Sequence, residues 1–143
     1  MRRIDELFER YGESHRNALN KAIHWVCVPL ITWSLLAALW AWTPIAAVAL
    51  ILGAMIFYAT LSLTIAVGML AVSVTMLATL ALAPSRQELL IAAAAVFALA
   101  WIGQFIGHHI EGRKPSFVDD VKFLLVGPAW LLAFAYRRLG VVY

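Results

Sequence analysis

The sequence has few charged residues for its length. Only 13% of its 143 residues are Asp, Glu, Lys or Arg, whereas an ordinary soluble domain has about 25%. Hydrophobic residues make up 64%, and the mean hydropathy is +0.86. Too little polar surface remains to cover a water-soluble globule, which argues against a soluble enzyme. Disorder is excluded as well, because disordered chains combine low hydrophobicity with high charge.

Cysteine and clustered basic residues are also scarce. Cys27 is the single cysteine, so neither an intramolecular disulfide nor a thiolate metal cluster can form. The net charge is only +3, and no basic block or aromatic–basic repeat occurs, so nucleic acid is not an expected partner. The first apolar stretch follows a polar, partly acidic lead, unlike the short basic start of a secretory signal, and we expect it to be retained.

The charge is missing mainly from one long stretch. No Asp, Glu, Lys or Arg occurs between Lys21 and Arg86, a gap of 64 residues. As a helix this stretch would extend roughly 96 Å, about three times the thickness of a bilayer core of about 30 Å. A second charge-free run extends from Leu89 to Ile110. The sequence therefore predicts an integral membrane protein in contact with lipid.

We expect residues 1–143 to form one membrane domain with an all-α fold. Breaks in the hydrophobic pattern divide it into a bundle of four crossings. Pro44 suits the first turn of a helix, Pro84 marks a clear break, and an internal turn is expected near 58–63. Pro29 should kink the first crossing or mark its true start. The predicted crossings are residues 22–42, 44–60, 63–83 and 87–110.

Two amphipathic or short segments flank the crossings. Residues 1–20 predict an amphipathic helix that can lie in the membrane interface. Its apolar stripe consists of Ile4, Leu7, Phe8, Tyr11, His15 and Leu19. Residues 120–138 predict a short C-terminal helix, interrupted at Gly127-Pro128. We expect it to be re-entrant or to lie on the surface, because as a fifth crossing, the open alternative, it would export Arg137 and Arg138.

Four crossings place the N-terminus and the loop at 111–122 on one side, which carries nearly all of the Lys and Arg residues. The positive-inside rule makes that side cytoplasmic, and the expected location is a bacterial inner membrane rather than the endoplasmic reticulum. All four histidines fall on this side: His15, His24, His108 and His109. Imidazoles gathered at one membrane face are a candidate metal site for iron, zinc or copper. The alternative is that they are ordinary interfacial residues.

Polar neighbours strengthen the case for a metal site. Metal-bound histidines need a second hydrogen-bond partner, and Asn17, Asn20 and Gln104 are available for this role. Asn20 shares a helix face with His24, and both Gln104 and Glu111 lie near the face of His108. A helix–helix hydrogen bond explains Gln104 equally well, because an amide without a hydrogen-bond partner is costly within a membrane.

Helix geometry sets two conditions for a shared metal. His15 and His24 are nine residues apart, which at about 100° per residue places them on opposite sides of a straight helix. They can converge only if the chain bends between them, and we expect the bend at 17–20. His108 and His109 differ by about 100°. Both can bind one ion only over the groove between them or if the helix end unwinds.

Several blocks resemble one known family. Tyr11…His15…Asn20…His24…Pro29, then Trp101-Ile-Gly-Gln-Phe-Ile-Gly-His108 and Glu111-Gly-Arg-Lys-Pro115, resemble the membrane 2-hydroxy fatty acid dioxygenases over essentially the whole chain. The resemblance implies an iron(II)-dependent enzyme that uses O2 to shorten a 2-hydroxy fatty acid by one carbon. It implies His15, His24 and His108 as iron ligands, with His109 a weaker candidate.

The residues are compatible with such a reaction but do not select it. A 2-hydroxy acid offers a carboxylate and an adjacent hydroxyl as a chelate, and its tail can lie between the helices. Arg113 and Lys114 could bind the carboxylate, although they also serve as topology determinants. Two alternatives stay open: a non-catalytic carrier or scaffold, and another lipid metalloenzyme such as a zinc hydrolase. The absence of Asp, Glu, Lys and Arg from residues 22–85 counts against ion transport.

Overall fold

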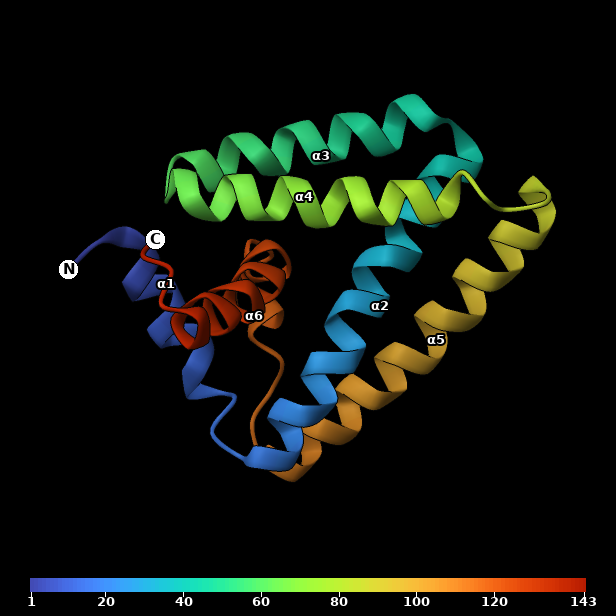
Figure 1. The fold of residues 1–143 in the computed structure, drawn as a ribbon. Helices are drawn as coiled ribbons and strands as arrows, with labels where there is room; N and C mark the ends of the chain where they lie inside the picture. The colour runs from blue at the N-terminus through green and yellow to red at the C-terminus, as the bar shows by residue number, and fades with distance from the viewer.

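The computed structural model describes all 143 residues and consists of helices and short connections (Figure 1). Six α-helices and one 3₁₀ turn follow one another along the chain. They are α1 (Arg3–Glu13), α2 (Ala18–Trp42), α3 (Pro44–Ala59), α4 (Leu63–Leu80), α5 (Arg86–Glu111), η1 (Ser116–Val118) and α6 (Phe123–Leu139). The all-helical class predicted from the sequence is confirmed.

Three of these helices are long and apolar enough to cross a membrane: α2, α4 and α5, whose best windows have mean hydropathies of 1.8, 2.1 and 2.3. The fourth predicted crossing, α3, is apolar but has only 16 residues. Large hydrophobic side chains such as Ile56, Val67 and Leu99 are exposed on the outer faces, as expected for surfaces that contact lipid. The four-crossing arrangement, and a re-entrant or fifth crossing by α6, stay predictions.

The two longest helices, α2 and α5, run antiparallel and side by side (Figure 1). Glycine permits this close packing. A Cβ atom at Gly103 would lie 2.6 Å from Cys27 Sγ, and one at Gly107 would lie 2.4 Å from Asn20 Oδ1. This Gly-x-x-x-Gly spacing lets helices approach closely in a membrane. It brings the first turns of α2 beside the last turns of α5, where three of the histidines lie.

The helices α3 and α4 form a hairpin that runs in a different direction from the α2–α5 pair (Figure 1). The turn between them, Thr60–Ser62, lies in the predicted range, and the Ser62 hydroxyl accepts a hydrogen bond from the backbone N–H of Ile65. Two tyrosines tie the hairpin to α6. Tyr58 Oη donates to the carbonyl of Leu125 at 2.7 Å, and Tyr136 Oη donates to the carbonyl of Thr64 at 3.3 Å.

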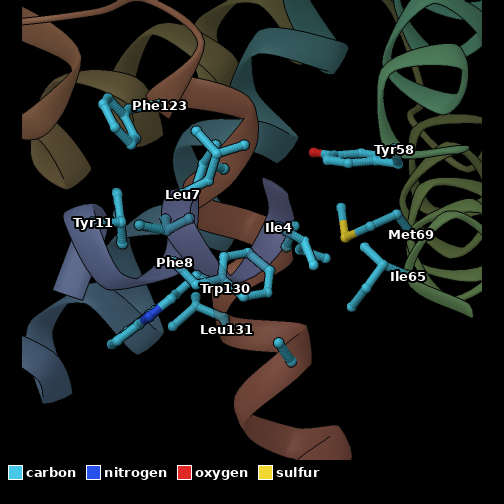
Figure 2. Close-up of a cluster of buried hydrophobic side chains, with 14 of the residues drawn as sticks. Ile4, Leu7, Phe8, Tyr11, Tyr58, Ile65, Met69, Phe123, Trp130 and Leu131 are labelled. Atoms are coloured by element: carbon cyan, nitrogen blue, oxygen red, sulfur yellow. The ribbon is translucent and has the colours of Figure 1, made fainter. Parts of the chain in front are cut away.

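A large apolar cluster joins α1 and α6 to the α3–α4 hairpin (Figure 2). Ile4, Leu7, Phe8 and Tyr11 of α1 are all buried in it. The apolar stripe predicted for residues 1–20 therefore packs on protein rather than on lipid, and Leu19 does not take part, since it is 56% exposed. A second cluster, which includes Leu36, Ile51 and Leu89, lies where α2, α3, α4 and α5 meet.

The structure corrects three details of the sequence interpretation. The N-terminal helix ends at Glu13 instead of continuing to residue 20, because residues 14–17 leave the helix and Asn17 caps α2. Pro29 lies inside α2 and does not mark its start, which is Ala18. Pro128 lies inside α6 and does not interrupt it.

We predict that Gly107→Ala lowers the stability of the protein. The new methyl group would meet the Asn20 side chain, whose amide is held by hydrogen bonds to the Ser14 carbonyl and to Glu111. Overpacking of this kind costs about 1–3 kcal/mol. The midpoint of thermal unfolding in detergent should fall. Gly53→Ala is the matched control, because no heavy atom lies within 4 Å of its added Cβ. Equal midpoints in the two variants would contradict the close contact.

Candidate metal centre

Three histidines from distant parts of the sequence meet at the end of the α2–α5 pair. His15, His24 and His108 are 3%, 1% and 4% exposed. One potential ligand atom from each lies within 4.8 Å of the other two. The Nε2 atoms of His24 and His108 are 3.1 Å apart. Three buried imidazoles at this spacing form a group that could bind a metal ion.

His15 lies in the non-helical segment between α1 and α2, and Tyr11 fixes its ring. The Nδ1 of His15 donates to the carbonyl of Tyr11 at 2.6 Å. The two rings stack, with centroids 4.1 Å apart and planes 16° from parallel. Because Nδ1 carries the proton, Nε2 has a free lone pair, and that atom is buried without a hydrogen-bond partner. The bend that the sequence required between His15 and His24 is present, but it lies at residues 14–17 and not at 17–20, because α2 already begins at Ala18.

His24 and His108 approach from the two long helices. The Nδ1 of His24 donates to the carbonyl of Asn20 at 2.8 Å, which again leaves the lone pair on Nε2. A carbonyl that holds the far nitrogen is the usual support for a metal-bound histidine. The Nδ1 of His108 is buried and has no partner in the chain. A direct hydrogen bond between His24 and His108 would use the lone pair of His24 Nε2. It would still leave His15 Nε2 and His108 Nδ1 without a partner.

The spacing of the Nε2 atoms of His24 and His108 fits two ligands of one metal ion. With metal–nitrogen bonds of about 2.0–2.1 Å, two neighbouring ligands of a tetrahedral or octahedral ion lie roughly 2.8–3.4 Å apart. The observed 3.1 Å between the two Nε2 atoms lies in this range. Nitrogen-only donor sets suit iron, zinc or copper. Burial first, and the neighbouring His24 second, lower the pKa of His15 to about 3, so this imidazole is neutral and able to bind a cation at neutral pH.

Glu111 lies close to this group but its carboxylate is already occupied. Its oxygens accept hydrogen bonds from the backbone N–H of Arg16 at 2.9 Å, from that of Asn17 at 2.8 Å, and from Asn20 Nδ2 at 3.0 Å. The last residue of α5 thereby caps the start of α2. These contacts hold the His15 segment against the helix that carries His108. Glu111 thus ties the segment of His15 and the start of α2 to the end of α5.

The remaining predicted site residues take different positions. Asn17 accepts from the backbone N–H of Leu19 and Asn20 as the cap of α2. Gln104 is buried and lines a small cavity beside His15 and His108. His109 is exposed and lies outside the histidine group, because α5 stays helical through Glu111 and does not unwind. Arg113 and Lys114 are exposed and line a neighbouring polar cavity, which has a volume of about 370 Å³.

Sequence reasoning did not assign roles to several residues around the centre. Tyr11 holds His15, and its position four residues earlier was a usable signal. The Ser14 hydroxyl lies 3.1 Å from His15 Nδ1 and 2.7 Å from the Ser116 hydroxyl. Trp101 lines the same small cavity as Gln104, and its indole N–H is buried without a partner. No spacing rule links Ser14 to Ser116, since 102 residues separate them.

Comparison with known proteins identifies the family. A family model described as "2-hydroxy-palmitic acid dioxygenase Mpo1-like" matches residues 1–139. The chain belongs to this Mpo1-like family. Its name implies an enzyme that uses O2 on a 2-hydroxy fatty acid, and a membrane-compatible helical fold with a buried three-histidine group agrees with such a metalloenzyme. Neither the curated proteins nor the solved structures contain a match to this Mpo1-like chain.

Proposed function

We propose that the protein is an iron(II)-dependent dioxygenase that shortens 2-hydroxy fatty acids by one carbon. The observation that carries the proposal is the buried histidine group in a chain of this family. Hydrogen bonds keep the proton of two of its imidazoles on Nδ1. The Nε2 lone pairs of His15 and His24 are thus available, beside His108, for one ion. With three protein ligands, coordination positions would stay open for substrate and O2.

The chain's residues take distinct roles in this proposal. His15, His24 and His108 are the ligands, and the carbonyls of Tyr11 and Asn20 orient two of them. Glu111 and the Asn17 cap hold the His15 segment in place. His109, which is exposed, is not a ligand. A three-histidine set differs from the two-histidine, one-carboxylate set common in iron oxygenases, and Glu111 does not supply the carboxylate, because three N–H groups already occupy it.

We place the substrate head group at the small cavity of about 50 Å³ next to the histidines. Gln104 and the unpartnered indole N–H of Trp101 line it and can donate hydrogen bonds to carboxylate or hydroxyl oxygens. Arg113 and Lys114, together with Arg10, line the adjoining polar cavity and can attract the carboxylate from the aqueous side. Ser116 and Phe123 line both cavities.

The overall reaction balances with O2 as the sole oxidant. A 2-hydroxy acid, R–CH(OH)–COOH, and O2 give R–COOH, carbon dioxide and water. The bond between the carboxyl carbon and the hydroxyl-bearing carbon breaks, and the latter becomes the new carboxyl carbon. When bound, iron(II) would supply the means of activating O2. The protein would hold the head group and exclude bulk water through the burial of His15, His24 and His108.

The placement in the cell follows the charge distribution. We propose a bacterial inner membrane, with the N-terminus and the metal centre on the cytoplasmic side. The α2 start and the α5 end carry Lys21, Arg113 and Lys114, whereas the opposite end carries only Arg86. The positive-inside rule assigns the more basic end to the cytoplasm.

Turnover of 2-hydroxypalmitate tests the proposed function. Detergent-purified protein loaded with iron(II) should convert it, in the presence of O2, to the fifteen-carbon acid measured by mass spectrometry. Palmitate without the hydroxyl is the control and should not react, since it lacks the second chelating oxygen. Turnover only with zinc, or hydrolysis of an ester, would indicate a different lipid metalloenzyme. Lack of any turnover with iron, zinc or copper would favour a carrier or scaffold.

A further inference from the structure

An apolar cavity of about 300 Å³ lies in the interior of the helical domain. Residues from α2, α3, α4, α5 and α6 line it. Leu36 and Ile51 on its wall belong to one hydrophobic cluster, and Tyr58 and Met69 belong to the other (Figure 2). The cavity therefore separates the two parts of the core. Its volume is at the lower end of small-molecule sites, which are roughly 300–1,000 Å³.

This apolar cavity adjoins the small cavity at the histidines. Five residues line both: Ile31, Thr32, Trp101, Leu124 and Pro128. On α5, Phe97, Trp101, Gln104 and His108 recur at steps of three or four and so form one stripe. The stripe changes from apolar to polar to metal-binding along the helix. A fatty acid has the same order of chemistry from tail to head.

We propose that the apolar cavity binds the alkyl tail of the substrate and that the space beside Ser73 limits the length of tail that it accepts. The proposal rests on the proposed function, because it takes the head group to be at the histidines. Trp101 lines both cavities and so stands at their junction, and its buried indole N–H has no partner in the chain. The rest of the wall is almost entirely hydrocarbon, so each methylene that enters gains apolar burial.

The cavity has a route to the bilayer. Leu35, Leu50, Phe97 and Leu124 line it and are also 38–45% exposed on the outer surface. A tail dissolved in the membrane can therefore enter sideways between the helices without passing through water. Entry from the lipid phase suits a substrate whose long tail favours the bilayer over water.

Ser73 on α4 lies where the apolar cavity meets another. Four residues line both the 300 Å³ cavity and a second apolar cavity of about 200 Å³: Thr32, Met69, Ser73 and Pro128. The side chain of Ser73 is small and only 8% exposed. A larger side chain at this position would take space that a long tail needs and a short tail does not.

A larger side chain at residue 73 tests whether the apolar cavity binds the tail. We expect Ser73→Phe to lower kcat/KM for 2-hydroxypalmitate about 10-fold relative to the twelve-carbon 2-hydroxy acid, because one buried methylene contributes roughly fourfold. The matched control is Val74→Phe, the same change at the next residue of α4, whose side chain is 56% exposed and lines no part of the cavity. Its ratio of kcat/KM values should equal that of the wild type.

A second variant guards against misfolding of the first. Ala54→Phe fills the same cavity from α3, and we expect it to shift the ratio in the same direction. Iron content of each variant should stay at the wild-type level. An unchanged ratio in both cavity variants, with wild-type iron content and turnover of short acids, would overturn the assignment of the cavity. Absence of turnover in the wild-type protein would instead overturn the proposed function.

Discussion

Iron binding should be lost in His24→Ala and in His108→Ala and retained in His109→Ala. The Nε2 atoms of His24 and His108 are 3.1 Å apart and buried, so each is expected to supply one of only three protein ligands. Removal of either leaves two imidazoles, too few to hold iron against detergent and buffer. The wild-type protein should contain about one iron per chain, and both variants should contain almost none when measured by elemental analysis.

His109→Ala is the matched control for this experiment. It removes the same side chain from the same turn of α5, but from the exposed face of the helix and outside the histidine group. Thermal unfolding of all three variants should be measured without metal, so that loss of iron is separated from loss of fold. Full iron content in a folded His24→Ala or His108→Ala variant would remove that residue from the ligand set. Loss of iron in His109→Ala would mean that α5 unwinds at its end.

Glu111→Ala should weaken iron binding about 10- to 100-fold without changing its stoichiometry, the range typical for residues that support metal ligands. The carboxylate accepts from three N–H groups in the first turn of α2 and the segment before it. Without it, the segment that carries His15 loses its attachment to α5. At saturating iron the variant should still bind about one ion per chain, whereas a ligand variant should not.

Two further variants make this test specific. Glu111→Gln keeps one acceptor oxygen but turns an N–H₂ group toward the same donors, so its iron affinity should fall between those of Glu111→Ala and the wild type. Glu88→Ala removes a carboxylate from the opposite, exposed end of α5 and should leave affinity unchanged. Affinity would be measured by competition with a chelator of known strength. Wild-type iron affinity in Glu111→Ala would show that the hydrogen bonds accepted by Glu111 are not needed to hold His15 in place.

Local chemistry made much of the helical pattern predictable. Long apolar runs in this chain predict buried or lipid-facing helices. Pro44 and Pro84 interrupt these runs, because a proline disfavours the helical conformation of the residue before it. The helices α3 and α4 accordingly begin and end within a few residues of the predicted bounds 44–60 and 63–83. Pro128 misled the prediction of a break in the C-terminal helix, and Pro29 does not mark the start of α2, because packing against other helices tolerates a proline that an isolated helix would not.

The candidate site was predictable as a set of residues but not as an arrangement. The spacing of His15 and His24 required a bend, and the structure has one at residues 14–17. The reason for that bend is not local. Glu111, more than ninety residues away, accepts hydrogen bonds from the bent segment, and Gly107 permits Asn20 to approach α5. No pattern within the first twenty residues contains these contacts.

Hydropathy and charge act along the chain, so the sequence was enough to predict an all-helical protein with helices apolar enough to cross a membrane. Which of the histidines meet depends on how those helices pack. His108 and His109 are neighbours of the same chemistry, yet one is buried beside His24 and the other is exposed. The direction in which a helix presents each side chain to its neighbour makes this choice, and α2 packs on only one face of α5. The apolar cavity likewise exists only where five helices meet, and the small cavity at the histidines adjoins it.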